Sequence, residues 1–224
     1  MKYLKYIFIF IVLPIQIYLA IWYTPVVKGL GESTRVFYYH VPVAWLAVLS
    51  FLISALYSVQ FLRKRDFTAD LKAEANARLG LLFSVLATVS GSLWAKITWG
   101  DLWNWDPRET SILILLIIYL AYFTLRSSVE EEDRKATLSA VYSLAAFATV
   151  PILIFVVPRM YESLHPDPIL NERGKVEMSS TIRWIFLFSM ITFTWLFAYL
   201  KKYQEELMLL KNRKRNLILE KLKK

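Results

Sequence analysis

The sequence contains no cysteine, and only 2 of its 224 residues are histidine. The absence of cysteine excludes disulfides, thiolate metal sites, thiol chemistry and a CxxCH attachment motif within this chain. A GxxxxGK[ST] phosphate-binding loop is also absent, so any ATP hydrolysis linked to this protein must be done elsewhere. Metal or proton chemistry that relies on imidazole must therefore use His40 and His165.

Charged residues are scarce and apolar residues abundant. Only 20% of the chain is charged, whereas 57% is hydrophobic, and the mean hydropathy is +0.42. Soluble domains average about 45–50% apolar and about 25% charged residues. Six apolar segments qualify as helical membrane spans, namely residues 6–27, 41–62, 79–95, 111–125, 136–158 and 184–200. We therefore predict an all-α, polytopic integral membrane protein with six transmembrane helices.

The N-terminus imitates a signal peptide, but its apolar run reaches Pro25 without an A-x-A-like cleavage site, which predicts a retained first span. Pro14 and Pro151 lie inside apolar segments, where neighbouring helices can compensate for the lost hydrogen bonds. No linker or repeat interrupts the pattern. We expect one membrane domain over residues 1–200 and a basic cytoplasmic tail, helical in part, over residues 201–224.

The net charge of +9 is more informative about the orientation of the protein in the membrane than about a ligand. With six spans, most of the 27 Lys and Arg residues fall on the side that holds both termini. The positive-inside rule then places both termini in the cytoplasm, with anionic membrane lipid as a further partner of the basic tail. Nucleic-acid binding is disfavoured, because the positive charge is spread over several loops instead of one folded surface.

Both histidines fall on the predicted outer side, in segments 28–40 and 159–183. The third outer segment, 96–109, belongs to a stretch from 94 to 106 that holds half of the 8 tryptophans. An interfacial tryptophan belt is the ordinary interpretation of such residues. Their density, with Gly100 and polar residues between them, also predicts an aromatic platform that stacks on a flat apolar ligand.

Asp106, Pro107 and Glu109 form the pattern of an N-cap, a proline at the first helical position and a capping box, which predicts the start of the fourth span. Capping is compatible with a second role in shaping a site. Gly100 is expected to allow a turn with positive φ.

A surface position is the default interpretation for either histidine alone. Together, two imidazoles on one face of a membrane suit the two axial positions of a haem iron, since the porphyrin supplies the other four nitrogens. Helix N-termini at this face would attract the haem propionates, and three arginines lie beside them: Arg35, Arg108 and Arg183. Snorkelling residues that set topology are the alternative for these arginines.

Residues 99–110, WGDLWNWDPRET, resemble the tryptophan-rich "WWD" signature of the haem-handling proteins of cytochrome c maturation. Residues 35–45, RVFYYHVPVAW, resemble the segment that carries the first haem-ligand histidine in the haem exporter protein C (CcmC) family, and His165 matches the position of the second. Six spans with both termini inside also match. The departures are Leu102, where the exporters usually have an aromatic residue, and Pro107, where they have a small one.

The resemblance implies a non-enzymatic carrier in a bacterial cytoplasmic (inner) membrane. It would hold haem b on the periplasmic face and pass it to a periplasmic haem chaperone (CcmE). His40 and His165 would be the axial ligands, Trp99, Trp103 and Trp105 the platform, and Asp106 and Arg108 its edge. The implied partners are ABC transporter subunits (CcmA and CcmB) and a small membrane subunit (CcmD).

Two other functions remain open at the level of sequence. The DPRET segment is closer to the CcsA type, a membrane component of a haem lyase, although six spans and the absence of histidine within any span favour the CcmC type. Ion or solute transport predicts charged residues inside the spans, and the predicted spans contain none. Met160 and Met178 are the alternative axial ligands on the outer side.

Overall fold

A computed structural model describes residues 6–27, 31–165 and 178–222, and these residues are helical apart from short connections. Its long helices are α3 (Thr34–Lys64), α4 (Phe67–Trp99), α5 (Pro107–Ser128), α6 (Glu132–Pro151) and α8 (Ser180–Leu222). Five helices are long and apolar enough to cross a membrane, counting α6 together with its continuation to Met160. The helical, multi-span character predicted from the sequence is confirmed.

The first predicted span is shorter than expected. It is helical over Phe8–Tyr23, as η1 (Phe8–Val12), α2 (Leu13–Tyr18) and η2 (Leu19–Tyr23), and this stretch is shorter than the five long helices. Thr24 leaves the helix with an extended backbone at ψ 132°, as expected for a residue before Pro25. The predicted span, which ended at residue 27, was therefore too long.

Proline is accompanied by π-helical stretches in two places. Pro14 lies between two π-helical stretches, and Pro151 is followed directly by a third, η3 (Ile152–Val156), before α7 (Val157–Met160). Proline lacks the N–H that continues the α-helical pattern, and the chain shifts to i→i+5 bonds beside it, as in Val157 N–H to Ile152 O. In each case hydrogen bonds within the same helix replace the one that proline cannot make, so the helix continues past the proline.

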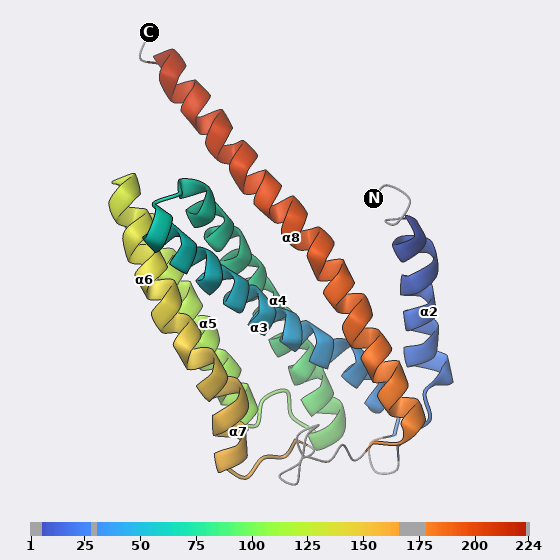
Figure 1. The fold of residues 1–224 in the computed structure, drawn as a ribbon. Coiled ribbons are helices and arrows are strands. Elements are labelled where there is room, and N and C mark those ends of the chain that lie inside the picture. The colour runs from blue at the N-terminus through green and yellow to red at the C-terminus, as the bar shows by residue number, and fades with distance from the viewer. Residues whose placement is uncertain (1–5, 28–30, 166–177, 223–224) are drawn as a thin grey trace.

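Successive long helices run in opposite directions, and the two termini lie at the same end of the bundle (Figure 1). The opposite end holds the α4–α5 loop and the end of α7 (Figure 1). α8 extends well beyond its neighbours at the terminal end, so the helical tail expected after residue 200 is continuous with the last span.

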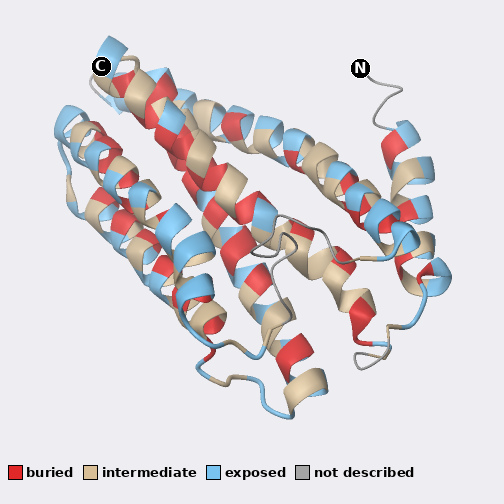
Figure 2. Cartoon of the chain, turned by 60° about the horizontal axis from the view of Figure 1, so that its bottom comes forward, coloured by how far each residue is buried: buried red, intermediate tan, exposed pale blue. Residues whose placement is uncertain are grey.

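α3 and α4 form the most extensive helix pair. Ser54 donates its hydroxyl hydrogen bond to Ala73 O at 2.8 Å, and at Gly80 a Cβ atom would come within 2.3 Å of the Phe51 ring. Small residues let membrane helices approach this closely. Phe51 in turn stacks on Tyr119 of α5, and the buried positions lie on the faces that the helices turn towards each other (Figure 2). This packed core fixes α3, α4 and α5 against one another.

Candidate functional site

His40 lies on α3 and faces α4. Its Nδ1 is 3.0 Å from Ser90 Oγ, and the Ser90 hydroxyl donates its own proton to Leu86 O at 2.8 Å. A hydroxyl has one proton to give, so the Ser90 oxygen accepts from His40 Nδ1–H. When the ring is neutral, its lone pair is therefore on Nε2.

Gly91 makes room for the His40 ring. A Cβ atom at this position would lie 2.9 Å from His40 Cε1, closer than side chains tolerate. Trp94 limits the ring on another side, with an edge-to-face contact at 5.9 Å between centroids, and its own Nε1–H donates to Ser33 Oγ. The part of α4 from Ser90 to Trp94 thus forms the surface on which His40 packs. Gly91 leaves room for the ring and Trp94 bounds it.

His165 follows α7 and lies against the start of α5. Its Nδ1 is 3.0 Å from Oδ1 of Asp106, with the N–H too bent for a regular hydrogen bond. The other carboxylate oxygen accepts from Ser163 Oγ and from the Leu164 backbone N–H, both at 2.8 Å. Ser163 Oγ also accepts from the His165 N–H at 3.1 Å. Asp106 therefore fixes the backbone of residues 163–165 as well as facing the imidazole.

The same carboxylate caps α5. Asp106 Oδ1 accepts a hydrogen bond from the Arg108 N–H at 2.9 Å. Glu109 Oε2 accepts one from the Asp106 N–H, which completes the capping box. Gly100 ends α4 with φ at 94°, a left-handed conformation that favours glycine. The predicted cap and the predicted glycine turn are both confirmed. The contact from Asp106 to residues 163–165 has no local sequence signal, because the partners are far apart along the chain.

The Asp106 side chain is wholly buried, with none of its surface exposed. Burial opposes its ionisation, but the hydrogen bonds from Arg108 N–H and Ser163, and the nearby His165, together hold the pKa of Asp106 below its usual value. Burial lowers the pKa of His165, with a further contribution from Arg108, although Asp106 opposes the change. The pair is therefore a carboxylate beside a neutral imidazole, which leaves His165 Nε2 with a lone pair when the Nδ1 proton faces Asp106.

His40 and His165 lie close enough to interact electrostatically, and Arg108 lies near both. The structure thus brings His40, His165, Asp106 and Arg108 together at the end of the bundle opposite the termini. In the described parts of the chain, no group of three or more His, Cys, Asp or Glu side chains is placed to hold a metal ion.

The tryptophans do not share one plane. Trp99 meets the His165 ring edge-to-face at 4.8 Å, whereas Trp103 and Trp105 lie perpendicular to each other at 5.9 Å. Trp94 is buried, and Trp105 is 71% exposed with φ at 58°, an uncommon conformation for a residue with a side chain. Trp99 thus packs on a histidine, Trp103 is half-buried, and Trp105 is the exposed ring of the loop.

Three other residues predicted on this side have separate surroundings. Arg35 pairs with Glu32, and Met160 is 69% exposed at the end of α7. Arg183 is exposed near the start of α8. Residues 166–177, which complete the last outer segment, lie outside the described residues.

Ser90, Gly91 and Ser163 were missed by sequence reasoning. Ser90 and Gly91 lie on α4 inside a predicted span, where serine and glycine are ordinary helix-packing residues. A Ser-Gly pair at the level of His40 is the one signal that could have identified them.

The fold and this site together define a multi-span helical membrane protein with two neighbouring neutral imidazoles at one end. The family described as "Heme exporter protein C" (CcmC) matches residues 2–220 of the chain. The chain belongs to this family, which confirms the resemblance and decides for the CcmC type over the CcsA type.

Individual relatives agree. The chain is 34% identical over 170 residues to heme exporter protein C of Bradyrhizobium diazoefficiens, covering 76% of this chain and 64% of that protein. It is 33% identical over 171 residues to a ccmC-like mitochondrial cytochrome c biosynthesis protein of Marchantia polymorpha, covering 76% and 72%. For heme exporter protein C of Escherichia coli K12 the identity is 30% over 166 residues, covering 73% and 67%. The aligned part thus spans about two thirds to three quarters of these relatives.

Proposed function

We propose that this protein holds haem b at the end of the bundle formed by the α4–α5 loop and delivers it for cytochrome c maturation. His40 and His165 are the axial ligands, each through Nε2. Haem is cargo here: its porphyrin supplies four nitrogens to the iron, so two imidazoles complete the coordination. A saturated iron disfavours oxygen chemistry, so the protein acts as a carrier and not as an enzyme.

The observation that carries this proposal is that each imidazole has its Nδ1 3.0 Å from a polar side-chain oxygen. Metal-bound histidines almost always present their second nitrogen to a carboxylate, a carbonyl or another hydrogen-bond partner, which fixes the ring and its tautomer. His40 uses Ser90, and His165 faces Asp106. Both Nε2 atoms are thereby left for iron.

The remaining residues have complementary roles. Trp103 and Trp105 cover the macrocycle from the outer surface, while Trp99 holds His165 in place. Arg108 pairs with a propionate, and the capped start of α5 adds the positive end of a helix dipole. This end of the bundle faces the periplasm in an inner membrane, with both termini in the cytoplasm.

The recipient is a periplasmic haem chaperone of the CcmE kind. The proposed assembly also contains ABC transporter subunits of the CcmA and CcmB kind and a small CcmD-like subunit. The names of the relatives, which refer to haem export and cytochrome c biosynthesis, support this placement.

Complementation tests the function. In a bacterium that lacks its own heme exporter protein C, this chain should restore haem-loaded chaperone and c-type cytochromes. His40→Ala and His165→Ala should insert at normal levels and restore neither. Lys202→Gln, which removes an exposed charge of α8 on the side of the termini, serves as the control and should remain active. Full cytochrome c yield from both histidine variants would overturn the proposal.

A further inference from the structure

A cavity opens towards the terminal end of the bundle, and neither His40 nor His165 lines it. It has a volume of about 890 Å³ and is lined by α4, α5, the start of α6 and the distal half of α8. Val85, the lining residue of α4 nearest to the histidines, is five positions from Ser90, or about 7.5 Å along a helix, whereas Arg78, where the charged lining of α4 begins, is 12 positions or about 18 Å away. The charged end of this cavity is therefore distant from the proposed haem site.

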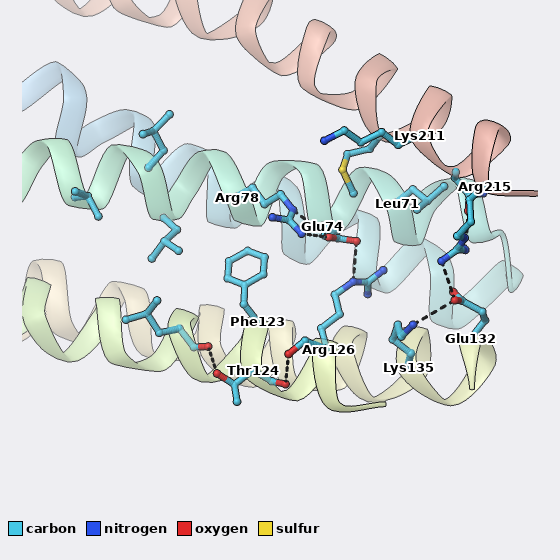
Figure 3. A pocket seen from close by; sticks show the side chains of 17 residues that line it. Leu71, Glu74, Arg78, Phe123, Thr124, Arg126, Glu132, Lys135, Lys211 and Arg215 are labelled. Atoms are coloured by element: carbon cyan, nitrogen blue, oxygen red, sulfur yellow. Dashed lines mark hydrogen bonds and ion pairs between the residues drawn. The ribbon is translucent and has the colours of Figure 1, made fainter. Parts of the chain in front are cut away.

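The lining is divided into an apolar part and a charged part. Leu82, Val85 and Leu120 belong to the cavity, and 44% to 53% of their surface is exposed. On α4, Leu82 and Val85 lie beyond Arg78, towards the middle of the span. On α5, Leu120 lies before Arg126 and is likewise nearer the middle of the span. The charged side chains gather at the other end of the cavity (Figure 3). This order, charge at the helix ends and apolar surface deeper in the span, is the order of a phospholipid.

Positive charge exceeds negative charge in the lining. Five Lys or Arg side chains and two glutamates contribute to it. Lys135 and Arg215 share the single carboxylate of Glu132, at 3.2 and 3.0 Å, and Lys211 extends along the cavity from α8 (Figure 3). The cations facing the cavity are therefore only partly neutralised.

The inner wall is rigid. Arg126 forms a bidentate pair with Asp70, at 2.8 and 2.6 Å, and a third bond to Glu74 at 2.8 Å. Glu74 also accepts two bonds from Arg78, at 3.0 and 2.6 Å. Both arginines are thus held in place by α4, while Lys211 and Arg215 lie on a helix that extends beyond the rest of the bundle (Figure 1).

We propose that this cavity binds one anionic phospholipid, with its phosphate between Lys211, Arg215 and Lys135 and its acyl chains along Leu82, Val85 and Leu120. The lipid would tie the distal half of α8 to the start of α6, where Arg215 pairs with Glu132. Charge complementarity favours an anionic headgroup over a zwitterionic one, because each Lys or Arg near an anionic lipid adds to its binding.

Native mass spectrometry of the purified full-length protein tests the proposal with phosphatidylglycerol and phosphatidylcholine of identical acyl chains. One phosphatidylglycerol should bind about tenfold more tightly than phosphatidylcholine. Lys211→Gln with Arg215→Gln should abolish this preference. Arg213→Gln with Lys214→Gln removes the same charge from exposed positions of the same helix outside the cavity, and should keep it.

Lys211→Gln alone is the second variant, because it leaves the Arg215–Glu132 pair intact and should still weaken phosphatidylglycerol binding several-fold. Equal binding of the two lipids would overturn the proposal, as would equal losses in the cavity and control variants. Displacement of the lipid by haem at matched concentration would also overturn it and assign the cavity to the cargo. No readout for lipid depends on loaded haem, so failure here is distinguishable from failure of the proposed function.

Discussion

The Asp106 carboxylate joins parts of the chain that the sequence separates widely. It caps α5, anchors Ser163 and Leu164, and faces the His165 imidazole. Sequence reasoning identified the cap, because the DPRE pattern is local. It could not identify the contact with residues 163–165, because only tertiary packing brings that segment back to the start of α5. The candidate ligands, by contrast, were predictable, since the chain contains only two imidazoles.

Asp106→Asn keeps the helix cap but removes the charge and one of the two accepting oxygens. Asparagine caps a helix about as well as aspartate. Its amide nitrogen cannot accept the bonds that Oδ2 accepts from Ser163 and Leu164, so the thermal midpoint should fall modestly. The charge that faces His165 is lost, however, and loss of such a partner typically costs 10–100-fold in metal affinity. Haem bound per protein after purification, measured by absorbance, should therefore fall at least tenfold. Unchanged haem content in the variant would show that Asp106 serves only the fold.

Substitution of Trp103 and Trp105 is a second test at the scale of single residues. Replacing both with Ala should leave insertion unchanged, because both lie in the α4–α5 loop and Trp105 is 71% exposed. Stacking on an aromatic side chain is worth roughly 1–3 kcal/mol per contact by analogy with bases. Haem retention and cytochrome c yield should both fall. Normal values for both would leave these residues as interfacial anchors.

At the scale of helices, composition and hydropathy predicted where most spans lie but not where the helices end. α4 begins at Phe67 and α8 continues to Leu222, each well into charged sequence. Helical hydrogen bonds do not depend on the bilayer, and i,i+4 pairs such as Arg78–Glu74 and Lys201–Glu205 stabilise these extensions. The rotation of α4 that presents Ser90 and Gly91 to His40 depends on packing against α3, which no local pattern encodes.

Gly91→Ala tests that rotation. The new methyl group would lie 2.9 Å from His40 Cε1 and should displace the ring from Ser90. Alanine favours a helix over glycine by up to about 1 kcal/mol, so stability should not fall while haem retention drops and the haem absorption spectrum changes.

Gly80→Ala is the matched control on the same helix. Its methyl group meets the buried Phe51 ring at 2.3 Å and should cost about 1–3 kcal/mol of stability. The folded fraction should retain a normal haem spectrum. Parallel effects of both substitutions on stability and haem would contradict a specific seat for His40.

At the scale of the whole molecule, the proposed orientation has a simple test, because the chain contains no native cysteine. Single cysteines introduced at Asp101, in the α4–α5 loop, and at Lys214, in α8, lie at opposite ends of the bundle. In intact spheroplasts, a membrane-impermeant maleimide should label the cysteine at 101 and not the cysteine at 214. Both should react after lysis. The reverse pattern would place the histidines in the cytoplasm and exclude direct delivery to a periplasmic chaperone.

The most direct test of the two-histidine site is the absorption and electron paramagnetic resonance spectrum of the haem-loaded protein. The intact protein should be low-spin with two nitrogen axial ligands. His165→Ala should open one position, lose the low-spin signature and retain less haem, and added imidazole should restore part of both. An unaltered low-spin spectrum and full haem content in His165→Ala would contradict the site and favour Met160 or Met178 as the second ligand.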